Sequence, residues 1–263
     1  MNTNLDEQKT NAFKKLLYVM DELREKCPWD NIQTNETLRT LTIEETFELA
    51  DAIIDNNDDA IRKELGDILL HIIFYAKIGE EKGVFNIADV INTLVDKLIY
   101  RHPHIFGDVK VKDATEVTEN WEQLKLKEKG GNKTVLEGVP QSLCAMIKAN
   151  RIQDKARGAG FDWEERSQVW DKVEEELNEL KVEIDHQNSD AIEAEFGDLL
   201  FSLINAARLY GINPENALER TNRKFISRFN YLEQQTIQKG INLKSMSLAE
   251  MDKIWEEAKR VES

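Results

Sequence analysis

Five acidic residues occur twice in this chain at one spacing, and together they have the chemistry of a divalent-cation site. Each acid of the first set has an acidic counterpart 131 positions later. Ten acids do not stay in register by chance, so the chain contains a duplicated unit. Converging carboxylates need a counter-charge, and oxygen-only ligands favour Mg²⁺, with Mn²⁺ as a substitute. The two sets are Glu44, Glu45, Glu48, Glu64 and Asp67, and Glu175, Glu176, Glu179, Glu195 and Asp198.

The spacing of these acids places them on helix faces. Residues three and four positions apart share one face of an α-helix, so Glu-Glu-x-x-Glu and Glu-x-x-Asp each project carboxylates together. A solvated, salt-bridged face is the ordinary interpretation of one such motif. Here, however, long apolar runs follow both Asp67 and Asp198. Because a carboxylate beside a buried helix is costly unless it is paired or binds a metal, we interpret both sets as metal ligands.

The four histidines do not repeat with the acids. His71 lies one turn beyond Asp67, but its counterpart is Ser202, so we interpret His71 as a core or edge residue and not as a ligand. A di-iron carboxylate bundle needs Glu-x-x-His in two helices. Iron chemistry is therefore not expected.

A glycine lies between the two acids of the second motif in both repeats, as Gly66 and Gly197. Glycine inside a helix costs about 1 kcal/mol relative to alanine. We therefore expect a helix or a ligand to approach the backbone closely there.

Helices must position these groups. With only 12 Gly and 4 Pro, the chain has few of the turn residues that a β protein needs between its strands. Apolar residues also recur at helical spacing. We predict an all-α protein. Each half has a helix with the first motif, a short polar turn at 55–59 or 186–190, a helix that opens on the second motif, and two further helical segments. This pattern predicts two tandem domains that resemble four-helix bundles.

A charged stretch at 127–134 contains glycine and lacks apolar periodicity, which is typical of a linker. We predict an N-terminal domain over 1–127, a linker over 128–137 and a C-terminal domain over 138–263. Similar segments that start at Trp121 and Trp255 mark the ends of the two halves.

The composition is strongly acidic, with 35 Lys+Arg, 50 Asp+Glu and a formal net charge of −15. Such a field repels phosphate polymers, so neither a nucleic-acid polymer nor an anionic membrane is an expected partner. The two cysteines show no paired spacing, as in reduced proteins, and the polar N-terminus has no signal-peptide core. We expect a soluble cytoplasmic protein.

A Mg²⁺–carboxylate cluster usually acts on phosphate, and such a site needs cations for the remaining charge. Lys224 and Arg228 lie one turn apart, and Lys97 and Arg101 match them in the first half. Trp255 has the ring to stack on a nucleobase, although a core role is commoner for tryptophan.

Several further motifs accompany the acids, and together they resemble the MazG family of nucleoside triphosphate pyrophosphohydrolases over essentially the whole chain. Leu41 departs from the pattern, because an aromatic residue is usual there. The motifs are Cys27-Pro-Trp-Asp30 with Gln33-Thr34, the block Ile43–Glu48, Arg101-His-Pro-His104, Arg151-Ile-Gln153, Gly160-Phe-Asp-Trp163 and the segment around Trp255.

The resemblance implies Mg²⁺-dependent hydrolysis of an NTP or dNTP to the monophosphate and pyrophosphate, with broad base specificity, and a homodimer in which helices of two chains complete each bundle. It implies that the five acids of the second set hold the metal, with Glu175 or Glu176 steering the attacking water. Lys224 and Arg228 would neutralise the departing pyrophosphate, with Lys224 as a catalytic group. Trp255 would contact the base or ribose.

The acids do not decide which half is active, but a basic residue does favour one. Lys172 lies one turn before Glu176 and either reaches a phosphate or forms a salt bridge with that acid, whereas its counterpart is Leu41. We expect the second half to be the main catalytic unit.

Two alternatives remain open. One is a non-catalytic helical module whose acidic face recruits a basic partner, which would not require the acids to keep one register. The other is a pyrimidine-selective hydrolase of dUTP or dCTP, which requires side chains that read base edges.

Overall fold

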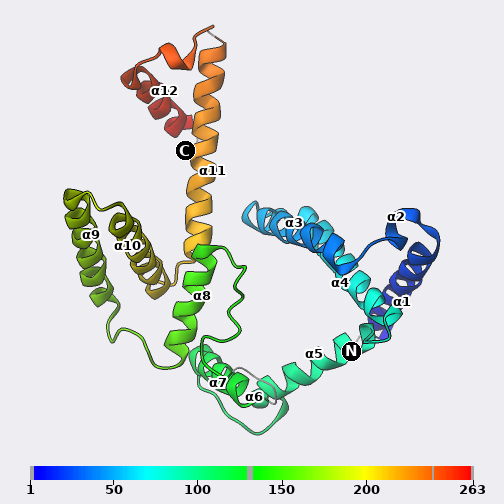
Figure 1. Cartoon of the computed structure of the whole chain (residues 1–263). Coiled ribbons are helices and arrows are strands. Elements are labelled where there is room, and N and C mark those ends of the chain that lie inside the picture. The colour runs from blue at the N-terminus through cyan, green and yellow to red at the C-terminus, as the bar shows by residue number, and fades with distance from the viewer. Residues whose placement is uncertain (1–2, 129–132, 239, 262–263) are drawn as a thin grey trace. The chain divides into compact units, whose positions relative to one another are not determined.

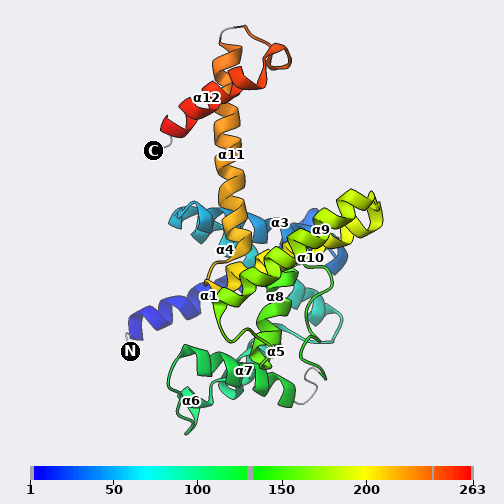
Figure 2. The same cartoon turned by 90° about the vertical axis from the view of Figure 1, so that its left-hand side faces the viewer.

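The computed structural model describes residues 3–128, 133–238 and 240–261, and these residues form helices, turns and loops without a strand. The all-α prediction is confirmed. Contacts divide the chain into two compact units, residues 1–110 and 111–263. Figures 1 and 2 show the helices of each unit from two directions.

The first unit contains α1 (Thr3–Lys26), α2 (Pro28–Asn31), α3 (Asn35–Ile54), α4 (Asp58–Glu81), α5 (Ile87–Arg101) and α6 (Pro103–Phe106). The second contains α7 (Ala114–Lys127), α8 (Ala145–Gly158), α9 (Val169–His186), α10 (Ser189–Leu209), α11 (Pro214–Ile237) and α12 (Leu248–Val261), with short 3₁₀ turns η1 (Arg166–Gln168) and η2 (Leu243–Ser245). Two hairpins, α3–α4 and α9–α10, carry the two acidic sets, and the helices of each hairpin pack on one another (Figure 1).

The turns of the two hairpins have the same backbone geometry at matching positions. Asn56 and Gln187, which are 131 positions apart, both adopt the left-handed backbone conformation, with φ of 51° and 57°. The next residues, Asn57 and Asn188, cap α4 and α10 by accepting a hydrogen bond from a backbone N–H of the first turn. The duplication therefore extends to the geometry that sets one acidic helix against the other.

The core of the first unit lies between α1, α3 and α4. Leu41, the counterpart of Lys172, is one of the half-buried residues that pack against this core. A leucine at that position therefore has a structural role. The fully buried core residues are Met20, Leu38, Ile73, Phe74 and Ile78.

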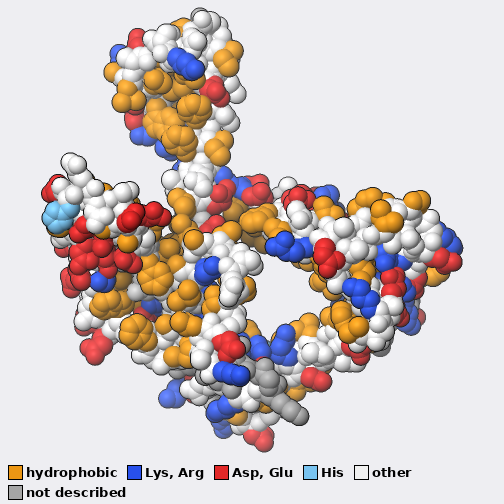
Figure 3. All heavy atoms as spheres, in the orientation of Figure 1, with side chains coloured by type: hydrophobic (Ala, Val, Ile, Leu, Met, Phe, Trp, Pro, Cys, Tyr) orange, Lys and Arg blue, Asp and Glu red, His pale blue; other side chains and the backbone are white. Residues whose placement is uncertain are grey.

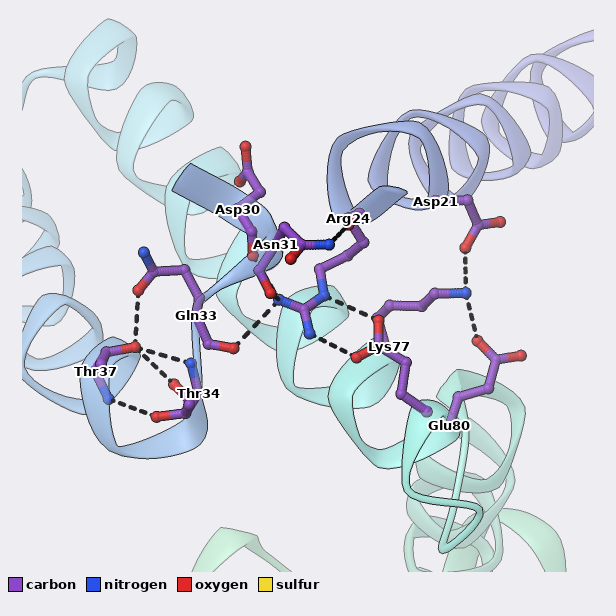
Figure 4. Close-up of polar contacts among 10 residues, drawn as sticks. Asp21, Arg24, Asp30, Asn31, Gln33, Thr34, Thr37, Lys77 and Glu80 are labelled. Carbon is purple, nitrogen blue, oxygen red and sulfur yellow. Dashed lines mark hydrogen bonds and ion pairs between the residues drawn. The ribbon is translucent and has the colours of Figure 1, made fainter. Parts of the chain in front are cut away.

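Arg24 of α1 holds the connection between α1 and α3 in place (Figure 4). Its guanidinium donates to both carboxylate oxygens of Glu81 on α4, and these hydrogen bonds raise the pKa of the arginine. Nη1 also donates to the backbone carbonyl oxygens of Asp30, Asn31 and Gln33. One side chain thus fixes the Cys-Pro-Trp-Asp segment relative to α4.

The start of α3 is fixed by a reciprocal cap. Thr34 and Thr37 each accept a hydrogen bond from the other's backbone N–H, and Thr37 donates to Gln33 (Figure 4). Lys77 of α4 pairs with Asp21 of α1. The cap fixes where α3 begins, and the ion pair joins α1 to α4.

In the second unit, Val169, Val173 and Ala206 form a small core between α9 and α10. Leu199 and Leu209 pack against this core. Trp170, the next residue after Val169, donates its indole Nε1–H to Tyr210 Oη at 3.0 Å. The rings of these two residues lie 6.1 Å apart. The hairpin is thereby closed at the end where α9 begins and α10 ends.

The loop between α8 and α9 is anchored by a nearly buried arginine. Arg208 of α10 donates to both carboxylate oxygens of Asp162 and to Asn205 Oδ1. This ion pair holds the Gly-Phe-Asp-Trp segment against α10, while Phe161 next to it is 84% exposed.

Helix α7 contacts α8 and is part of the second compact unit, whereas the sequence places it at the end of the first domain. The domain bounds 1–127 and 138–263 stay a prediction, and residues 129–132 of the proposed linker lie outside the described residues. Among the helices that the structure describes, none is long and apolar enough to cross a membrane.

Candidate metal and nucleotide site

In each hairpin, two acids of the first helix meet one acid of the second. One oxygen from each of Glu45, Glu48 and Glu64 lies within 4.8 Å of the others, and the same holds for their counterparts Glu176, Glu179 and Glu195. Figure 3 shows acidic side chains gathered over α9 and α10. The folding of a duplicated sequence therefore builds the same three-carboxylate group twice.

The remaining four predicted ligands lie beside these groups. Glu44 and Glu175 are exposed, and Asp67 and Asp198 lie one turn beyond the second-helix glutamates, which places their charges near Glu45 and Glu195 respectively. The structure thus gives three inner and two outer carboxylates in each unit.

Each group contains a buried oxygen without a hydrogen-bond partner among the described residues. These atoms are Glu64 Oε2 and Glu195 Oε2, at matching positions of the two repeats. A buried carboxylate oxygen without a partner carries a desolvation cost that a bound cation would remove. The donor set, all carboxylate oxygen, suits a hard divalent cation. The residues present therefore fit a metal ion.

Burial and the neighbouring negative charges raise the pKa of one acid in each group. Burial, followed by the charges of Asp67, Glu48 and Glu64, raises the pKa of Glu45. Burial and then the charge of Glu179 raise the pKa of Glu195. A bound cation would lower both pKa values again.

Each group is partly neutralised by one lysine, but the two lysines come from different helices. Lys172 of α9 contacts Glu176 Oε1 at 2.7 Å and Glu175 Oε1 at 3.0 Å. Lys63 of α4 contacts Glu64 Oε1 at 3.0 Å and Asp67 Oδ2 at 3.7 Å. In the second unit, the lysine therefore pairs with acids of α9, the first helix of its hairpin. In the first unit, the lysine pairs with acids of α4, the second helix of its hairpin.

An open pocket of about 290 Å³ borders the acids of the second unit. Glu179 and Glu195 line it with Asn178, Val182 and Glu183. The glycines of the second motif adjoin open space as well. Beyond the chain neighbours and the nearby backbone of the same helix, no described atom lies within 4 Å of where a Cβ would stand on Gly66 or Gly197. The close approach predicted there is therefore not made by the residues that the structure describes.

The predicted nucleotide-binding residues Lys224, Arg228 and Trp255 lie on α11 and α12, which pack together through Phe225 and Trp255 with ring centroids 5.1 Å apart. In the part of the chain that the structure describes, no ion pair or hydrogen bond joins Lys224 or Trp255 to the acids. The structure brings together the acids and Lys172, but no such contact joins Lys224 or Trp255 to them among the described residues.

His71 is buried, as expected of a core residue, and burial lowers its pKa. Sequence reasoning overlooked two cations. Lys63 has the helical spacing to reach Asp67, but it has no counterpart in the second repeat, where Ala194 stands. Arg24 could be recognised only from the fold, because its partners are mainly backbone carbonyls.

Comparison with known families gives two matches to one domain. The family model for the MazG nucleotide pyrophosphohydrolase domain matches residues 33–106 and 165–232. Both matches contain one complete acidic hairpin.

Similar proteins align over nearly the whole chain. A Thermotoga maritima protein, named nucleoside triphosphate pyrophosphohydrolase/pyrophosphatase MazG, is 43% identical over 94% of this chain and 95% of its own length. The nucleoside triphosphate pyrophosphohydrolase of Escherichia coli K12 is 38% identical over 96% of this chain and 98% of its own length. Bacillus subtilis YabN, an uncharacterised protein, is 45% identical over 95% of this chain and 53% of its own length.

Proposed function

The chain belongs to the MazG nucleotide pyrophosphohydrolase family, and on that premise we propose that it hydrolyses nucleoside triphosphates, ribo or deoxy, to the monophosphate and pyrophosphate with Mg²⁺ and broad base specificity. The observation that carries the proposal is the three-carboxylate group with its unpartnered buried oxygen, which occurs in both hairpins. A cytoplasmic location accords with this activity on nucleotide pools.

Glu176, Glu179 and Glu195 would hold the cation, with Glu175 and Asp198 as outer ligands. When bound, Mg²⁺ would polarise the phosphate oxygens of the substrate and lower the pKa of the attacking water. Mn²⁺ would satisfy the same ligands.

The chain's own residues would then orient and neutralise the substrate. A carboxylate of Glu175 or Glu176 accepts the proton of the water that attacks the α-phosphorus, and the bond to the bridging oxygen breaks to release pyrophosphate. Lys224 and Arg228 neutralise the charge that grows on this leaving group. Trp255 contacts the base or ribose without reading base edges, which accounts for broad specificity.

We assign the main activity to the second unit. Lys172 contacts the acids there, and it can turn to a phosphate once a cation neutralises Glu175 and Glu176. At the matching position of the first unit, Leu41 packs against the core.

A homodimer would complete the bundles. Large apolar side chains on both acidic hairpins are exposed, and apolar patches of this kind usually mark interfaces. A second chain packed there would also supply the close approach to Gly66 and Gly197. The exposed residues include Phe47, Leu65, Leu69, Phe196, Leu200 and Phe201.

The proposal is tested by incubating the protein with a panel of NTPs and dNTPs and resolving NMP, NDP, phosphate and pyrophosphate. We expect pyrophosphate and NMP, with turnover abolished by EDTA and restored by Mg²⁺. Glu176→Gln should lower kcat about 100-fold or more, since it removes a ligand and an acid–base group. Glu45→Gln is the matched control in the first unit and should retain most activity.

Other results would change the assignment. Loss of activity in Glu45→Gln alone would place catalysis in the first unit. Turnover of only dUTP or dCTP would establish a pyrimidine-selective enzyme instead. Absence of pyrophosphate with every nucleotide would refute hydrolysis and favour the non-catalytic interaction module.

A further inference from the structure

The two acid groups are compensated from opposite helices. In the second unit Lys172 pairs with acids of α9, and in the part of the chain that the structure describes no cation pairs with Glu195 or Asp198 of α10. In the first unit Lys63 pairs with Glu64 and Asp67 of α4. Neither lysine has a basic counterpart, because Leu41 and Ala194 occupy the matching positions.

Lys63 contacts one of the three carboxylates that would hold a cation in the first unit. The side chain of Glu64 is only 8% exposed, and Lys63 engages its Oε1 while Oε2 has no partner among the described residues. A cation bound by Glu45, Glu48 and Glu64 would coordinate the same Glu64 carboxylate that Lys63 contacts. The ammonium group of Lys63, whose side chain is 68% exposed, can leave for solvent without disturbing the core.

We propose that Lys63 is a built-in competitor for the divalent cation of the first unit. It lowers the affinity of Glu45, Glu48 and Glu64 for metal and supplies the counter-charge when metal is absent. This inference rests on the proposed metal site but concerns a residue outside the ligand set. A lysine of α4 therefore tunes the metal affinity of the first unit, whereas in the second unit the lysine beside the acids belongs to α9.

The test is a Mn²⁺ titration of the full-length protein at pH 8 without nucleotide, with free Mn²⁺ followed by electron paramagnetic resonance. The background variant Glu176→Gln/Glu195→Gln removes the second-unit site, so that the first unit is observed alone. Adding Lys63→Met should tighten Mn²⁺ binding about two- to fivefold, the range for a partly exposed ion pair. Lys9→Met, an exposed lysine of α1, is the control for net charge and should change affinity much less.

A reciprocal variant makes the test independent of how Lys63→Met folds. Ala194→Lys places a lysine at the matching, exposed position of α10, and in a Glu45→Gln/Glu64→Gln background it should weaken Mn²⁺ binding by a similar factor. Circular dichroism checks that each variant retains its helices.

Three outcomes would overturn the proposal. Equal Mn²⁺ affinity with and without the Lys63→Met substitution would show that the lysine is a bystander. Weaker Mn²⁺ binding in Lys63→Met would show that it supports the ligands. If the unmodified protein binds no Mn²⁺, the proposed metal site itself fails, and the inference fails with it.

Discussion

Positions 41 and 172 match in the two repeats but carry side chains with different roles. Leu41 packs against the core of the first unit, whereas Lys172 contacts Glu175 and Glu176. Spacing alone located the acids, of which the structure gathers three in each unit, and placed Lys172 beside Glu176. It did not predict Lys63, because a search for repeated residues passes over a cation that occurs in one repeat only.

The Asp162–Arg208 pair allows a prediction of pH-dependent stability. Burial raises the pKa of Asp162, but hydrogen bonds from Arg208 and the backbone N–H of Trp163 outweigh it, so the pKa lies below its ordinary value. The pair therefore stabilises the fold fully above the unfolded-state pKa, and its contribution is lost as the pH falls through the lower, folded-state pKa.

Asp162→Asn should accordingly lower the free energy of unfolding by about 1–3 kcal/mol at pH 7, the range for a hydrogen-bonded charged group. The difference from the unmodified protein should shrink below about pH 4. Urea unfolding at both pH values measures this, with the exposed Asp185→Asn as the control for charge. An undiminished difference in acid would show that packing, not ionisation, accounts for the loss.

At the scale of the helices, local signals predicted most of the fold. Polar turns and apolar periodicity located both acidic hairpins, and the structure adds that Asn56 and Gln187 share the left-handed conformation. The contact between α7 and α8 could not be predicted from the sequence. The similarity between the segments at Trp121 and Trp255 indicates a common origin, but it does not say which helix α7 packs against, since that depends on tertiary packing. The same limit applies to Lys224 and Arg228, whose distance from the acids depends on where α11 packs.

Two glycines of α4 make a matched pair for testing helix packing. A Cβ on Gly79 would lie 2.7 Å from the ring of Phe85 and 2.9 Å from its carbonyl oxygen. A Cβ on Gly66 would meet no described atom within 4 Å beyond its chain neighbours and the nearby backbone of its own helix. Gly79→Ala should therefore destabilise the first unit by about 1–3 kcal/mol.

Gly66→Ala should instead stabilise the isolated chain by about 0.5–1 kcal/mol, because alanine is the better helix former. Thermal unfolding of both variants gives the comparison. A destabilising Gly66→Ala would mean that another chain packs against this position, and its effect would then depend on protein concentration.

At the scale of the whole molecule, the exposed apolar faces of the hairpins predict self-association. We expect sedimentation velocity to show a dimer, and Leu200→Glu on α10 to shift it towards monomer, because a charge would be buried at the interface. Ile237→Glu, at the exposed end of α11, is the control and should leave the dimer intact. A monomeric unmodified protein at micromolar concentration would refute the proposed assembly.

The contact between Trp170 and Tyr210 gives the second hairpin an optical label of its own. Trp170 lies on the same helix as Glu176, and its indole N–H is bonded to the far end of α10, while α3 and α4 contain no tryptophan. A rearrangement of α9 against α10 would alter the emission of this ring, and the difference between the spectra of the unmodified protein and Trp170→Phe would isolate its signal. Fluorescence would therefore follow a rearrangement of the second hairpin separately from the first hairpin, whose helices contain no tryptophan.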